Sequence, residues 1–121
     1  MPIVDVTLVV ADGDGLAPQL ARELADALGA ALGCEPGRLW VRLHDLPAAR
    51  YAENGAGLDP GELPVFVTLL HADPPQGEAR TAEARRVCDT VARCTGRPPD
   101  RVHVELAAPG RGRVAFGGEL V

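Results

Sequence analysis

The sequence contains no lysine and no serine, and aromatic residues make up only 3% of its 121 positions. Without lysine there is no side chain to form a Schiff base and no phosphate-binding loop of the GxxxxGKS/T type. Without serine there is no serine nucleophile. The scarcity of aromatic residues predicts a core of aliphatic side chains, and no run approaches the 18 apolar residues of a transmembrane helix.

Acidic residues outnumber basic ones, because 17 Asp and Glu face 12 arginines, and the net charge is −5. An acidic chain is poorly suited to following a phosphate backbone, so we expect no nucleic-acid partner. The three cysteines are odd in number and lack CxxC spacing, which favours reduced thiols in a cytoplasmic protein without a signal peptide. The three histidines fall on separate segments without paired Cys or His spacing, so we expect no metal site.

The chain contains two similar halves, 1–62 and 63–121, within a single expected domain. Pro2 and Pro64 each precede a run of apolar, mostly β-branched residues, which is typical of a strand that opens on proline. A loop rich in Gly, Asp and Pro follows each run, and then a helical pattern that Gly33 or Gly96 ends. The expected strands are 2–9, 38–43, 64–71 and 101–106, and the expected helices carry the apolar stripes 20–32 and 84–91.

Two β-α-β units in tandem predict an α+β fold: a four-stranded sheet with both helices on one face, because such crossovers are right-handed. The other face then stays uncovered in a monomer. Trp40 lies on that sheet, and Ile3 and Val9 share one face of the first strand, so we expect the chain to form an oligomer. The tail 110–121 is expected to add a short edge strand.

The beginning of the chain carries a possible catalytic group. Methionine before proline is normally removed, which would leave Pro2 with a free secondary amine. Burial in an apolar pocket and nearby arginines would both disfavour its cationic form and lower its pKa. Such an amine can take a proton from carbon beside a carbonyl group and return it elsewhere. Pro64 cannot act in this way, because its nitrogen belongs to a peptide bond.

These features resemble the tautomerase superfamily, whose members are built from β-α-β units that start with a catalytic amino-terminal proline. The resemblance covers nearly the whole chain and implies a homotrimer with one site per chain. It also implies proton transfer without a cofactor on a small keto- or unsaturated carboxylic acid. The similar segments are Pro2, 44–51, Leu70-His71, Cys88 and 99–102.

The resemblance also suggests how a substrate carboxylate is bound. Arg80 opens a segment similar to the family's Gly-Arg-Ser/Thr motif, in which the arginine begins a helix and meets the substrate. Trp40 stands where single-unit members carry a binding arginine, and Arg42 shares its strand face and could supply the charge instead. In the alternative, purely structural interpretation, Trp40 is a buried residue of a subunit interface and Arg42 forms a salt bridge.

Four further residues match positions around the family's site. Tyr51 matches an aromatic residue that packs over the proline, and His103 and Glu105 match positions that line the neighbouring subunit's site. Glu53 resembles the carboxylate that activates water in the dehalogenase branch. If Glu53 faces Pro2, a hydratase or dehalogenase with Pro2 as acid and Glu53 as base becomes an alternative.

Two departures from the family favour a different substrate or a different role. The acidic loop 11–15 has no arginine where single-unit members carry one, and Cys34 stands near the position of a site lysine in one branch of the family. A non-catalytic trimer that binds a ligand or partner is therefore a second hypothesis. A ferredoxin-like binding domain shares the same element order and is a third.

Overall fold

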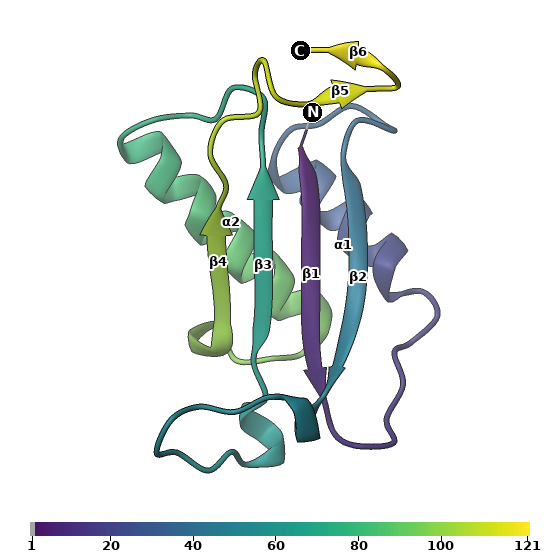
Figure 1. The fold of residues 1–121 in the computed structure, drawn as a ribbon, viewed down its shortest axis with the longest axis vertical. Helices are drawn as coiled ribbons and strands as arrows, with labels where there is room; N and C mark the ends of the chain where they lie inside the picture. The colour runs from purple at the N-terminus through teal and green to yellow at the C-terminus, as the bar shows by residue number, and fades with distance from the viewer. Residues whose placement is uncertain (1) are drawn as a thin grey trace.

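The structure is a computed structural model and describes residues 2–121. Its main sheet has the strand order β2-β1-β3-β4. The parallel pairs β1–β2 and β3–β4 each come from one half of the sequence, and the antiparallel pair β1–β3 joins the halves (Figure 1). The strand bounds are β1 Ile3–Val10, β2 Trp40–Pro47, β3 Val65–Leu70 and β4 Val102–Leu106.

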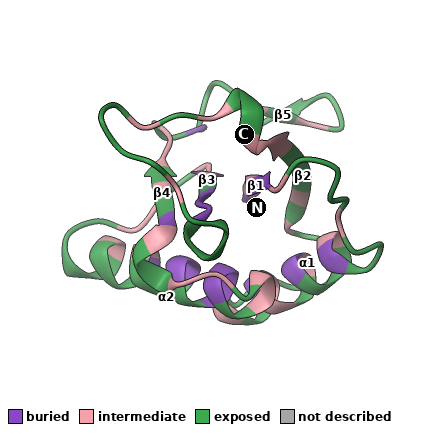
Figure 2. Ribbon diagram, turned by 90° about the horizontal axis from the view of Figure 1, so that it is seen from below, coloured by how far each residue is buried: buried purple, intermediate pink, exposed green. Residues whose placement is uncertain are grey.

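Two helices, α1 (Leu20–Ala31) and α2 (Glu78–Thr95), connect the parallel strands and lie together on one side of the sheet (Figure 2). The four-residue leucine spacing forms α1 as predicted, and Leu20, Leu24 and Leu28 are buried. At the end of α2, Gly96 has a φ of 69°, a conformation that glycine adopts without strain, and its N–H bonds to the carbonyl of Ala92. The fold class predicted from the repeat is confirmed.

The core lies between the helices and the helix-facing side of the sheet, and its hydrophobic cluster is aliphatic apart from Cys88, as the composition predicts. Two polar side chains of α2, Glu83 and Thr90, are also buried. Alternate residues of each strand point toward it, which is the period-two pattern of a strand with one covered face. The strand side chains of this layer include Val4, Val6 and Leu8 of β1 and Val65, Val67 and Leu69 of β3.

No helix among residues 2–121 covers the opposite face of the sheet. Here the register aligns Arg42, Asp5, Thr68 and Glu105 in one row across all four strands. Two large apolar side chains of this face are exposed, Trp40 by 38% and Phe66 by 39%. Val9 does not add to the exposed surface, because it is fully buried. We name this side the open face.

Two boundaries differ from the sequence predictions. The strand expected over 38–43 runs instead from Trp40 to Pro47, because β2 stays paired with β1 along its whole length. Residues 44–47 therefore belong to the sheet and not to a segment after it. The tail adds no edge strand: β5 (Ala115–Phe116) and β6 (Glu119–Leu120) form a separate two-stranded hairpin.

Candidate active site

Pro2 precedes β1 at the end of the sheet where β2 begins and β3 and β4 end (Figure 1). The Pro2 side chain is fully buried, and its carbonyl accepts a hydrogen bond from the Trp40 N–H at 3.1 Å. The β5–β6 hairpin lies across this end, and the Phe116 ring stacks on Trp40 at a centroid distance of 5.2 Å. We call this end of the molecule the proline end.

His71 follows β3 at the proline end. Continuing the register by one residue beyond the Ile3–Leu70 pair places His71 opposite Pro2. Its Nε2 lies 2.8 Å from Oε1 of Glu83, which α2 holds only 7% exposed. Sequence reasoning missed this pair. The sequence did contain one indication of it: Glu83 stands four residues before Val87 and so lies on the same buried side of α2.

Arg80 lies in the first turn of α2, at the helix end that the resemblance implies. It lines a cavity of about 420 Å³ together with Asp73, Gln76, Gly77 and Pro109. Arg111 holds the Asp73 carboxylate through both of its oxygens, one at 2.6 Å, and this hydrogen bonding lowers the pKa of Asp73. The negative charge of Asp73 is thereby neutralised beside Arg80.

Arg42 lies on the open face, opposite Asp5 in the β1–β2 register, and forms an ion pair with it. Its guanidinium donates to both carboxylate oxygens of Asp5, at 2.5 and 2.8 Å, and this hydrogen bonding raises the pKa of Arg42. The salt-bridge interpretation of Arg42 therefore describes the structure. Glu105 lies in the same row, exposed on β4 opposite Thr68.

Five side chains, three expected and two newly seen, gather at the opposite end of the sheet. The Tyr51 hydroxyl donates to Glu53 at 2.7 Å, and Arg101 donates to the same carboxylate oxygen. Hydrogen bonds from Arg101 and then Tyr51 lower the pKa of Glu53. The Phe66 ring contacts both Tyr51 and His103, at centroid distances of 5.8 and 5.3 Å. We call these residues, 51, 53, 66, 101 and 103, the distal cluster.

The structure therefore divides the expected site residues between two ends of one chain. Pro2, Arg80 and Trp40 lie toward the proline end, whereas Tyr51, Glu53 and His103 lie in the distal cluster. Within one chain Glu53 does not face Pro2. The condition on which the hydratase alternative depended is thus not met by a single chain.

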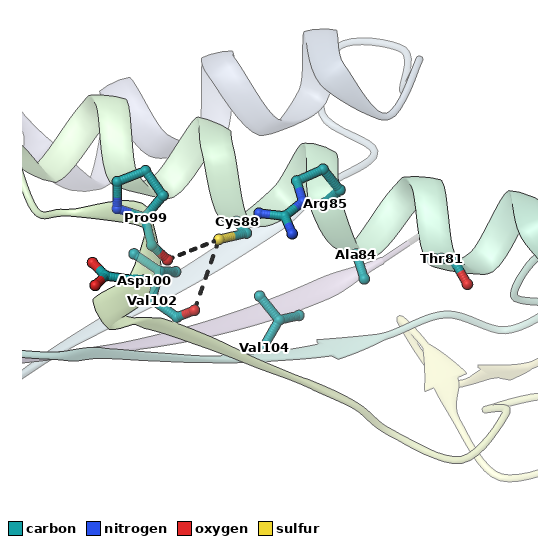
Figure 3. A pocket seen from close by; sticks show the side chains of 8 residues that line it. All are labelled: Thr81, Ala84, Arg85, Cys88, Pro99, Asp100, Val102 and Val104. Atoms are coloured by element: carbon teal, nitrogen blue, oxygen red, sulfur yellow. Dashed lines mark hydrogen bonds between the residues drawn. The ribbon is translucent and has the colours of Figure 1, made fainter.

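A cavity of about 600 Å³ lies elsewhere, between α2 and the edge strand β4 (Figure 3). Its centre holds the Cys88 thiol, which donates to the carbonyl of Pro99 at 3.3 Å and approaches that of Val102 at 3.8 Å. Burial raises the pKa of this thiol, and Asp89 adds to the effect. Cys88 is consequently a structural hydrogen-bond donor and a poor nucleophile.

Over residues 2–121, no group of three or more His, Cys, Asp or Glu side chains is placed to hold a metal ion. No helix in this range is long and apolar enough to cross a membrane.

No family model and no curated protein matches the sequence. Solved structures do match the fold over nearly the whole chain. A fused 4-OT solved as an asymmetric trimer has a TM-score of 0.75 and 20% identity, covering 98% of this chain and 94% of its own. Pt0534, solved after inactivation by 2-oxo-3-pentynoate, has a TM-score of 0.74, 22% identity and the same coverage, 98% and 94%.

Malonate semialdehyde decarboxylase, a structure described for its decarboxylase and hydratase activities, has a TM-score of 0.68 and 18% identity. The match covers 95% of this chain and 90% of that chain. These neighbours are members of the tautomerase superfamily. The two helices, the four-stranded mixed sheet and these matches together show that the chain has the tautomerase fold.

Proposed function

We propose that this chain catalyses proton transfer, without a cofactor, on a small carboxylic acid that carries a 2-oxo group or a conjugated double bond. The nitrogen of Pro2 is the general base. The observation that carries the proposal is the place of Pro2, which is buried at the start of a central strand, at the end of the sheet where α2 begins and carries Arg80 in its first turn.

The mechanism requires that Met1 be removed, because only then is the Pro2 nitrogen a secondary amine. The rigid ring has no side-chain rotamers to lose, and an apolar surrounding disfavours its protonated form. The neutral amine takes a proton from the carbon next to the carbonyl, and the C–H electron pair forms the carbon–carbon double bond of the enol. In the reverse direction the protonated amine returns a proton to that carbon.

Arg80 is the proposed clamp for the substrate carboxylate. Its guanidinium has no partner among residues 2–121, whereas Arg42 is held by Asp5 and Arg111 by Asp73. An arginine fork matches a carboxylate with two parallel hydrogen bonds. Its position in the first turn of α2 adds the partial positive charge of a helix amino terminus.

A homotrimer is part of the proposal. Trp40 and Phe66 leave exposed apolar surface on the open face, which a neighbouring copy would cover. The resemblance of His103 and Glu105 to positions that line a neighbour's site suggests that the distal cluster of one chain meets the proline end of the next. Tyr51 and His103 would then contact the substrate across the interface.

Proton transfer to carbon is favoured here over hydration. The Glu53 carboxylate already accepts hydrogen bonds from Tyr51 and Arg101, and the lowered pKa makes it a weak base toward water. It is better suited to holding Tyr51 and Arg101 in place than to activating a nucleophile.

The test is the ketonisation of phenylenolpyruvate by protein lacking Met1, compared with the Pro2→Ala variant. We expect the wild type to accelerate the reaction and Pro2→Ala to lose about 10²-fold or more in kcat, the usual contribution of a general acid–base group. Unchanged rates in Pro2→Ala, at an unchanged Tm, would contradict the proposal and favour a trimer that binds without catalysing.

A further inference from the structure

Among residues 2–121, the buried His71–Glu83 pair is the ionisable cluster at the proline end to which the proposed mechanism gives no role. The side chains are 16% and 9% exposed, and Nε2 of His71 lies 2.8 Å from Oε1 of Glu83. A carboxylate buried to this degree is costly unless it is paired. A leucine or valine at position 83 would continue the apolar stripe of α2 without the cost of removing a carboxylate from water. Packing alone therefore does not explain why Glu83 and His71 stand here.

The β1–β3 register, continued by one residue, places the pair next to Pro2. His71 stands opposite Pro2 in the continued β1–β3 register, and paired residues of antiparallel strands have Cα atoms about 4.5–5.5 Å apart. Val4 and Val6 point toward the helices, so by period two Pro2 shares that side. Since Glu83 is on α2, the imidazole also points to the helix side.

The contact with Glu83 fixes which nitrogen of His71 carries the proton. An ionised carboxylate only accepts hydrogen bonds, so opposite an ionised Glu83 it is Nε2–H that donates to Oε1, and in that uncharged tautomer the lone pair is on Nδ1. Within the part of the chain that the structure describes, Nδ1 has no hydrogen-bond partner. The imidazole is thus held in one orientation with a basic atom unused.

We propose that His71, positioned by Glu83, is a second acid–base group of the candidate site and exchanges a proton with the oxygen of the substrate's enol or keto group. The inference rests on the proposed function. In ketonisation, Nδ1 takes the proton of the enol hydroxyl and the O–H electron pair forms the carbonyl. The electron pair of the carbon–carbon double bond takes a proton from the protonated Pro2 amine. His71 then carries one proton more and Pro2 one fewer, and a transfer between them or through water restores both.

The other ionisable groups at the proline end either form an ion pair already or cannot accept a proton from the substrate. Burial raises the pKa of the Cys34 thiol, and the negative charge of Glu83 acts in the same direction, so Cys34 stays protonated. Asp73 is held by Arg111, and Arg80 remains cationic and accepts no proton. Among these side chains only the His71 imidazole has a nitrogen that can both accept and donate a proton.

The decisive variant is His71→Gln. The glutamine amide nitrogen can take the place of Nε2 and still donate to Glu83, while the atom corresponding to Nδ1 is lost. With phenylenolpyruvate as substrate we expect kcat to fall about 10²-fold with little change in KM. Arg86→Gln, at an exposed position of α2, is the control and keeps wild-type kinetics. Equal kcat in His71→Gln and the wild type, with Pro2→Ala inactive, would overturn the inference and leave the proposed function standing.

Two further readouts separate folding and chemistry. Labelling of Pro2 by 2-oxo-3-pentynoate should remain in His71→Gln, which shows that the amine is intact and the fold retained. ¹⁵N NMR of the imidazole in the wild type should show the Nε2–H tautomer, and Glu83→Ala should lose this preference. A wild-type ring protonated on Nδ1 alone would overturn the inference without reference to any activity. Wild-type rates in Pro2→Ala would overturn both proposals.

Discussion

Replacing Arg80 with methionine removes the proposed carboxylate clamp and keeps an unbranched side chain of similar reach. A hydrogen bond to a charged partner contributes about 1.5–3 kcal/mol. Arg80 is partly exposed in its cavity, so water screens it and the lower half of that range applies. A loss of about 1.5–2 kcal/mol corresponds to a decrease of about 10- to 30-fold in kcat/KM.

The assay compares two substrates that differ in charge only at the carboxylate, the enol of phenylpyruvate and the enol of its methyl ester. We expect Arg80→Met to lose the stated factor on the acid and to change little on the ester, because the ester offers no negative charge to the guanidinium. Arg86→Met, an exposed arginine of the same helix, is the control and should leave both rates unchanged. Equal losses on acid and ester would refute the clamp and point to a disturbed helix start.

Three further results are expected. Leu28→Ala, at a fully buried position of α1, should lower the free energy of unfolding by about 2–5 kcal/mol in urea titrations; a change near zero would contradict the packing of α1 on the sheet. Glu53 has a lowered pKa, so its pairing with Arg101 stabilises the fold above pH 4.5, its usual value, and this contribution disappears as the pH falls through the lowered value. The advantage of wild type over Glu53→Gln in urea should therefore be present at pH 7 and vanish in acid, and a constant difference would refute the assignment. Phe66→Lys, on the open face, should shift the sedimenting species from trimer toward monomer, and an unchanged trimer would place the interface elsewhere.

Local patterns were sufficient to predict the helices. Leucines four residues apart made α1 visible, and Gly96 marked the end of α2, because both signals depend on a few neighbouring residues. The length of β2 was not visible locally. Its last four residues include the polar His44 and Asp45 and end on Pro47, which is not typical of a strand, and only their pairing with β1 makes them one.

The candidate site was harder to predict for a topological reason. In a β-α-β unit the two strands are parallel, so residues after the second strand lie at the far end from the start of the first. Tyr51 and Glu53 therefore had to lie away from Pro2 in the same chain, and this separation could have been predicted from the sequence. The His71–Glu83 contact was not, because it depends on how α2 is rotated against the end of β3.

The central claim is that Pro2 carries a reactive, free amine, and mass spectrometry of the intact protein after treatment with 2-oxo-3-pentynoate tests it directly. The account predicts a chain that lacks Met1 and carries one adduct, which peptide mapping places on Pro2 and which Pro2→Ala does not form under the same conditions. A purified native chain that keeps Met1, or an adduct that maps to Cys34 and leaves Pro2 unmodified, would contradict the account.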